Sequence, residues 1–138
     1  MFLLDTDVLS ASRRPEKAGQ GLETWVANTN PRDMFLSAVS ILEIKIGALR
    51  LSRRDQRRGA ALDEWIRDRV LTKFEGRIIP FDALTALRCA PFHVPNTPPE
   101  RDAMIAATAL QHRFTIVTRN VRDFQRMGVP YLNPWTDA

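Results

Sequence analysis

Short apolar runs alternate with longer segments of helical pattern along this chain of 138 residues, and this alternation constrains its fold most strongly. Each run is only a few residues long, as expected of a buried strand, and segments with helix signals separate the runs. The runs lie at Phe2–Leu4, Met34–Leu36, Arg77–Phe81, Thr115–Val117 and Tyr131–Leu132. This order predicts an α/β fold, with a short parallel central sheet flanked by helices on both faces. The length fits a single domain over residues 1–138.

Local signals place the helices between these strands. Ser40 and Glu43 have the spacing of a capping box, which predicts that a helix begins at Ser40. Asp82 and Asn120 are good N-cap residues for two further helices. The longer helices are expected from about Asp7 to before Pro15, from Pro15 through Val26, from Ser40 through Leu49, along the apolar stripe Leu62–Phe74, and from about Pro99 to His112.

Composition excludes several classes of protein. The N-terminus reaches Asp5 after four residues, so we expect no signal peptide, and no apolar run approaches the ~18 residues of a membrane-spanning helix. Cys89 is the only cysteine, which excludes an intrachain disulfide and a multi-cysteine zinc site. We therefore expect a cytoplasmic protein.

One basic patch carries the whole net charge of +4. From Arg50 to Arg58 the chain has five arginines and one acid, which leaves 15 basic and 15 acidic residues elsewhere. Arginine binds phosphate or carboxylate through two parallel hydrogen bonds. The patch therefore suits nucleic acid, an acidic partner or simply a solvated helix face.

Acidic residues follow the strands or open the helices at several points of the chain. Because ligands of open parallel sheets bind beyond the carboxyl ends of the strands, we expect these acids to gather at one edge. Each acid alone is explained by helix capping, but several carboxylates together repel one another unless a hard cation such as Mg²⁺ or Mn²⁺ joins them. The carboxylates are Asp5, Glu43, Asp102 and Asp123, and the polar side chains expected beside them are Thr6, Thr118 and Asn120.

Four motifs in this order resemble the PIN-domain family, and most closely its VapC-type toxins, the ribonuclease components of type II toxin–antitoxin pairs. They are Leu4–Leu9, Ser40–Gly47, Asp102–Leu110 and Thr115–Phe124, and Leu132–Trp135 is typical of the same subgroup. The resemblance implies a PIN-like fold and a metal-dependent endoribonuclease that hydrolyses RNA phosphodiester bonds. It also implies a small antitoxin partner and a homodimer.

The resemblance assigns roles residue by residue. Asp5, Glu43, Asp102 and Asp123 match the catalytic acids, of which we expect Asp5, Asp102 and Asp123 to hold Mg²⁺ or Mn²⁺. Glu43 either activates the attacking water or helps to hold a second ion. Thr6, Thr118 and Asn120 match polar positions near the metal or the substrate.

Arg50 joins the expected substrate contacts because it lies seven residues after Glu43, about 10 Å along the same helical face. We hypothesise that Arg50, Arg53, Arg54 and Arg57 or Arg58 form an RNA track or a docking surface for an acidic antitoxin. Three positions depart from the family pattern. Asp7 is a possible fifth acid near the metal, Arg101 directly precedes Asp102, and Arg113 stands where a helix-ending glycine is common.

Two alternatives remain open at the level of sequence. Phe2–Leu9 also fits the opening motif of haloacid-dehalogenase-type phosphatases, in which Asp5 would be the nucleophile and Asp7 an acid. That class needs a later lysine, for which only Lys73 is available. The second alternative is a catalytically inactive PIN-like binding module. The presence of acids at all four catalytic positions argues against it.

Overall fold

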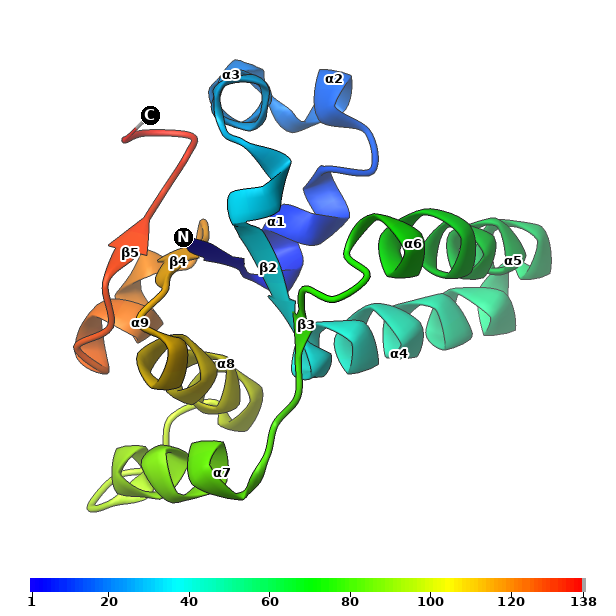
Figure 1. Cartoon of the computed structure of the whole chain (residues 1–138). Helices are drawn as coiled ribbons and strands as arrows, with labels where there is room; N and C mark the ends of the chain where they lie inside the picture. Colours follow the sequence, from blue (N-terminus) through cyan, green and yellow to red (C-terminus); the bar gives the residue numbers. More distant parts are fainter. Residues whose placement is uncertain (138) are drawn as a thin grey trace.

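The strands form where the apolar runs predicted them, and together they make one parallel sheet (Figure 1). The structure is a computed structural model that describes residues 1–137, so Ala138, the last residue of the expected domain, lies outside the described residues. The strand order is β3-β2-β1-β4-β5, which puts the N-terminal strand at the centre. The strands are β1 (Phe2–Leu4), β2 (Met34–Ser37), β3 (Ile78–Ile79), β4 (Thr115–Val117) and β5 (Tyr131–Leu132).

Helices cover both faces of this sheet, as the alternation predicted (Figure 1). On one face the core joins side chains of α1, α3 and α4 to those of the segment after α5. On the other face α8 and α9 pack on the sheet, and α7 packs against α8. The helices are α1 (Thr6–Ala11), α2 (Pro15–Ala18), α3 (Gln20–Asn28), α4 (Ala38–Arg54), α5 (Gln56–Trp65), α6 (Leu71–Lys73), α7 (Ala83–Cys89), α8 (Glu100–His112) and α9 (Val121–Arg126), with 3-10 turns at Pro31–Asp33 and Ala90–His93 and a π turn at Ile66–Val70.

Three predicted helix boundaries are wrong, one of them the end expected at Leu49, since α4 continues to Arg54. The helix expected from Pro15 through Val26 is divided, because Gly19 has a φ of 109°, a backbone conformation that ends α2 before α3 begins. The helix expected to begin at Ser40 starts earlier, since the Ser37 hydroxyl accepts a hydrogen bond from the Val39 N–H at 3.0 Å. Ser40 is therefore inside α4 and is free to contribute to another site.

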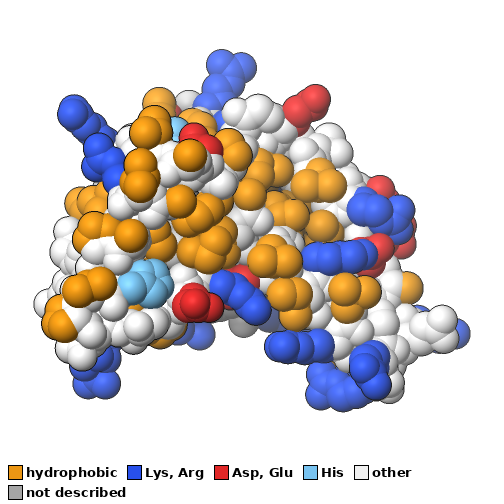
Figure 2. All heavy atoms as spheres, turned by 90° about the horizontal axis from the view of Figure 1, so that it is seen from below, with side chains coloured by type: hydrophobic (Ala, Val, Ile, Leu, Met, Phe, Trp, Pro, Cys, Tyr) orange, Lys and Arg blue, Asp and Glu red, His pale blue; other side chains and the backbone are white. Residues whose placement is uncertain are grey.

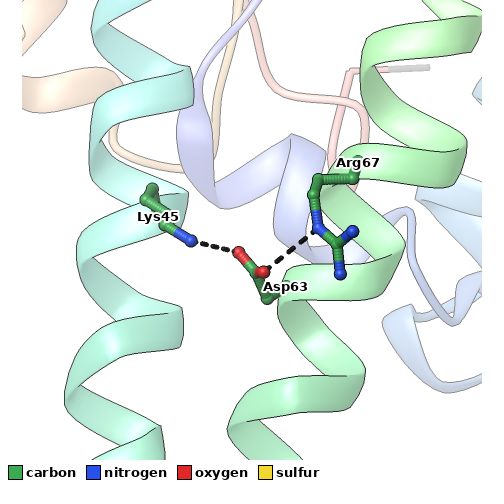
Figure 3. A network of polar contacts seen from close by, with 3 residues as sticks. All are labelled: Lys45, Asp63 and Arg67. Carbon is green, nitrogen blue, oxygen red and sulfur yellow. Dashed lines mark hydrogen bonds and ion pairs between the residues drawn. The ribbon is translucent and has the colours of Figure 1, made fainter.

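An antiparallel hairpin of α4 and α5 extends from the sheet edge. Asp55 lies between the two helices and caps α5 through the Arg58 N–H at 3.2 Å. The helices approach so closely that a Cβ on Gly59 would collide with Ser52. Lys45 of α4 pairs with Asp63 of α5, which also accepts from Arg67 at 3.2 Å (Figure 3). Within residues 1–137, none of the helices is long and apolar enough to cross a membrane.

Candidate active site

Asp5 and Thr118 lie where the strand order reverses, between β1 and β4, which is the usual position for ligands in an open α/β sheet. Asp5 is only 6% exposed and caps α1 by accepting from the Thr6 N–H at 2.8 Å. The fully buried Thr118 hydroxyl donates to Asp5 Oδ2 at 2.8 Å and accepts from the Asn120 N–H at 2.9 Å. Hydrogen bonds therefore fix the Asp5 carboxylate from two strand ends.

Glu43 approaches this pair from α4. Its Oε1 accepts from the Thr6 hydroxyl at 2.7 Å, and that hydroxyl also lies 2.9 Å from Ser40 Oγ. The prediction that Glu43 closes a capping box with Ser40 is wrong, because both side chains instead converge on Thr6. Ser40 is one turn before Glu43 and completely buried, so helical spacing is the signal that could have identified it as part of this network.

Asp102 and Asp123 approach from the other side of the sheet, in the first turns of α8 and α9. Asn120 Nδ2 donates to Asp123 Oδ2 at 2.9 Å and reaches Asp102 Oδ2 at 3.4 Å. Asn120 precedes α9, as predicted, but its side chain makes no capping bond to that helix. The amide instead joins the two acids, which places both beside the Thr118 turn.

Two of the three residues that depart from the family pattern, Asp7 and Arg101, also lie beside these acids. Asp7 Oδ2 accepts from the Arg119 N–H at 3.2 Å, and Arg101 Nη1 lies 3.8 Å from Glu43 Oε2. We call the five acids, Asp5, Asp7, Glu43, Asp102 and Asp123, the acidic centre. Arg50 is exposed on α4, and no hydrogen bond or ion pair found within residues 1–137 connects it to the acidic centre.

The environment of the acidic centre disfavours the ionised form of its carboxyl groups. Burial, and then the neighbouring charge of Asp7, raise the pKa of Asp5 from 3.8 to about 7. Burial, followed by the charges of Asp123 and Glu43, raises the pKa of Asp102 to about 6. Burial also raises the pKa of Asp7. The folded protein therefore favours protons, or another cation, at this edge of the sheet.

The donor atoms of the acidic centre suit a hard divalent cation. They are carboxylate oxygens, which magnesium and manganese prefer, and their mutual repulsion is relieved by positive charge. Among residues 1–137 no three acidic, histidine or cysteine side chains converge closely enough to enclose an ion as they stand. The fit is thus one of donor chemistry and electrostatics, with Asp5, Asp102 and Asp123 as the residues available to hold the ion.

Comparisons with known proteins agree on one family. Residues 2–130 match the PIN domain. Toxin FitB of Neisseria gonorrhoeae is 33% identical, with 99% of this chain and 100% of FitB covered. The crystal structure of FitAcB from that organism superposes with a TM-score of 0.88 at 32% identity, over 99% of both chains.

Two further proteins extend this similarity. The VapC ribonuclease Y4jK of Sinorhizobium fredii is 27% identical over the full length of both chains. A toxin–antitoxin complex from Klebsiella pneumoniae has a TM-score of 0.65 at 26% identity, with 97% of this chain and 98% of the other covered. All three relatives are therefore matched over nearly their whole length.

Proposed function

The chain belongs to the PIN-domain family, and from this premise we propose that it is a magnesium- or manganese-dependent endoribonuclease, the toxin of a type II toxin–antitoxin pair. The observation that carries the proposal is the buried Asp5 carboxylate at the β1–β4 crevice, with Asp102 and Asp123 beside it. The names of its relatives, a toxin and a VapC ribonuclease, support the same activity.

Asp5, Asp102 and Asp123 are proposed to hold the cation. When bound, Mg²⁺ or Mn²⁺ supplies Lewis acidity, which activates water and polarises the scissile phosphate. Thr118 fixes Asp5 through its buried hydroxyl, and Asn120 fixes Asp123 through its amide. These hydrogen bonds orient carboxylate oxygens before substrate arrives, which lowers the cost of organising the site.

Glu43 is proposed to position or deprotonate the attacking water. Its Oε1 is fixed by the Thr6 hydroxyl, while its Oε2 lies 3.8 Å from the Arg101 guanidinium. Arg101 is exposed and is therefore also available to a phosphate of the substrate. A substrate that draws Arg101 away would leave the Glu43 carboxylate free to accept a proton.

A protein partner is the second part of the proposal. Hydrophobic side chains gather on the face formed by α4 and α7, between charged groups (Figure 2). Leu42 and Leu49 of α4 are about half exposed, while Leu84 and Leu87 of α7 are 60% and 71% exposed. Such side chains suit a covering partner. We expect a small antitoxin, as in the related toxin–antitoxin complex, and a homodimer.

Cleavage of RNA by the purified protein tests the proposed activity. We expect single-stranded RNA to be cut with Mg²⁺ or Mn²⁺ and to remain intact with EDTA. Asp5→Asn should lower the rate at least about 100-fold, because it removes a carboxylate from the proposed cation site. Asp82→Asn is the matched control, since Asp82 caps α7 and asparagine caps equally well.

A rate that is equal in Asp5→Asn and in Asp82→Asn would contradict this assignment. Absence of RNA cleavage with either metal would favour the inactive binding module. Covalent phosphorylation of Asp5 by a phosphate ester would favour the phosphatase. Co-expression with the product of a neighbouring small open reading frame tests the partner, since an antitoxin should relieve growth arrest and copurify.

A further inference from the structure

A cleft of about 460 Å³ opens between α1, α2 and the α4–α5 hairpin, outside the acidic centre. Half of its ten lining residues are cationic, and among these described residues none is acidic. Small or apolar residues such as Ala11 and Leu51 form much of the remainder. We call the cationic residues the basic cleft: Arg13, Arg14, Lys17, Arg58 and Arg119. Five positive charges around one hollow favour the approach of a polyanion.

The basic cleft is only partly the arginine patch expected from the sequence. Of the five arginines between Arg50 and Arg58, only Arg58 lines it. Arg13 and Arg14 come from the segment that joins α1 to α2, Lys17 comes from α2 itself, and Arg119 comes from the loop after β4. The fold thus collects cations that are far apart in the sequence, which is why net charge along the chain did not indicate them.

Arg119 connects the basic cleft to the acidic centre. Its backbone N–H donates to Asp7 Oδ2 at 3.2 Å, and its neighbours in sequence are Thr118 and Asn120, which contact the acids directly. Arg119 is also one of the residues that line the cleft. A sugar-phosphate backbone that lies along the cleft and contacts Arg119 would therefore lie next to the acidic centre.

Trp135 fixes the position of the Arg119 side chain. The guanidinium carbon of Arg119 lies 3.8 Å from the centroid of a Trp135 ring. Trp135 Nε1 donates to the Ala18 carbonyl at 2.7 Å, and Ala18 lies at the end of α2 and lines the cleft. One tryptophan thus holds two walls of the cleft together and leaves Arg119 less freedom to lose on binding.

The cleft continues into a second hollow of about 710 Å³, with which it shares Arg13 and Arg14. Trp65 lines this hollow, and the Arg13 guanidinium carbon lies 5.9 Å from the centroid of its ring. Here acids, Glu64 and Asp68, stand among the lining residues. An aromatic side chain beside cations is the arrangement on which bases of a single strand stack.

From these contacts we propose that the basic cleft binds the sugar-phosphate backbone of single-stranded RNA and directs a phosphodiester to the acidic centre. The inference rests on the proposed ribonuclease function and adds the path of its substrate. An acidic centre repels a polyanion, so a cleavage site of this kind requires cations on the approach. Arginine, which supplies four of the five cations, contacts phosphate through two parallel hydrogen bonds.

The salt dependence of RNA binding tests this proposal. The probe is a fluorescent single-stranded RNA of mixed sequence, roughly 12 nucleotides long, and an Asp5→Asn background keeps it intact. Into this background we would introduce Arg14→Gln with Lys17→Gln, since both side chains are exposed and their loss leaves the core unchanged. We expect roughly tenfold weaker binding, and a slope of log K against log salt that is smaller by about 1.4, because two phosphate contacts are lost.

The matched control removes two cations elsewhere. Arg88→Gln with Arg126→Gln changes the net charge equally on α7 and α9, which pack beyond the opposite face of the sheet from α1 and α2. We expect this variant to keep the salt slope of the background. Equal losses in both double variants would reduce the effect to net charge and overturn the proposal.

Unchanged RNA binding in the Arg14, Lys17 variant would also overturn it. If that variant loses binding of poly-glutamate but keeps RNA, the cleft is a docking surface for an acidic protein segment instead. Failure here is distinguishable from failure of the proposed function. Metal-dependent RNA cleavage by the unmodified protein, together with an inert cleft, contradicts the cleft alone, whereas RNA binding through the cleft without any cleavage contradicts the nuclease.

Discussion

The acidic centre and the basic cleft adjoin at Arg119, yet they are built in opposite ways. The acids are held by hydrogen bonds to neighbouring side chains, from the buried Thr118 hydroxyl to Asp5 and from the exposed Asn120 amide to Asp123. The cations of the cleft are mostly exposed, and among their described contacts only stacking on Trp135 and Trp65 holds an arginine side chain in place. The acidic centre is therefore organised before a ligand arrives, while most of the cleft adapts to it.

This difference indicates separate roles for the two regions, the acidic centre in the chemical step and the basic cleft in substrate binding. Buried acids with raised pKa values cost the fold stability, which is reasonable only where chemistry needs them. Exposed arginines cost little and supply long-range attraction that salt weakens. We expect changes in the acidic centre to act on the rate of cleavage and changes in the cleft to act on affinity.

Among the substitutions that test these separate roles, Asp102→Asn should have the largest effect on the rate of cleavage. We expect cleavage to fall at least about 100-fold, because a proposed cation ligand is lost. RNA affinity should stay equal or rise, since a negative charge disappears from the substrate's approach. Single-turnover cleavage and fluorescence anisotropy measure the two quantities. A loss of RNA affinity that parallels the loss of rate would contradict separate roles.

Thr118→Val should have an intermediate effect. Valine keeps the shape but leaves Asp5 Oδ2 without its donor and the Asn120 N–H without its acceptor. We expect a cleavage rate that is lower by about 10- to 100-fold, and a free energy of unfolding that is lower by about 1–3 kcal/mol. Thr118→Ser keeps the hydroxyl and should recover most of the rate. If serine is as slow as valine, orientation of Asp5 is not the function of Thr118.

The pH dependence of stability should be a smaller, graded effect. Asp5 has a pKa of about 7 in the folded protein against an ordinary value of 3.8, so the folded state holds the extra proton. This contribution to stability is complete below about pH 4 and is lost as the pH rises through 7. Mg²⁺ binds the ionised acids, so its increase of the melting temperature should be larger near pH 8 than near pH 6.

Calorimetry with and without Mg²⁺ checks this expectation. In Asp5→Asn the metal-free protein should melt a few degrees higher near pH 8 and should gain less from Mg²⁺. A stabilisation by Mg²⁺ that is the same at both pH values, or the same in Asp5→Asn, would show that the ion does not act at these carboxylates.

Arg113→Gly should have the smallest effect and lies outside both regions. Arg113 ends α8 with a φ of 59°, in the left-handed region, where glycine is favoured. We expect glycine to stabilise the protein by about 0.5–1 kcal/mol, with unchanged cleavage and RNA affinity. Urea unfolding measures the change, and a decrease in stability would mean that the arginine side chain contributes more than its backbone strain costs.

Strands and acids were predictable from the sequence because both obey local rules. The strands β4 and β5 lie at the predicted residues, and Asp5 could be placed because it directly follows an apolar run. Asp102 was found in the predicted first turn of its helix. Glu43 was also expected in the site, but for a partly wrong reason, because its partner is the Thr6 hydroxyl instead of the end of its own helix.

The basic cleft was not predictable in the same way. Its cations come from the α1–α2 segment, from α5 and from the loop after β4, and only the packing of these elements brings them together. The linear cluster from Arg50 to Arg58 gave a stronger signal in the sequence, although a single member of it, Arg58, lines the cleft. Charge density along the chain therefore did not indicate where this cleft would form.

The most direct test of the separate roles is single-turnover cleavage of RNA over a range of enzyme concentrations. It compares Arg14→Gln with Lys17→Gln, in an otherwise unmodified protein, with Asp102→Asn. We predict that the cleft variant requires roughly tenfold more enzyme for half-maximal rate but reaches the same maximal rate, whereas Asp102→Asn loses the maximal rate alone. A cleft variant with a lower maximal rate and unchanged half-saturation would contradict the account.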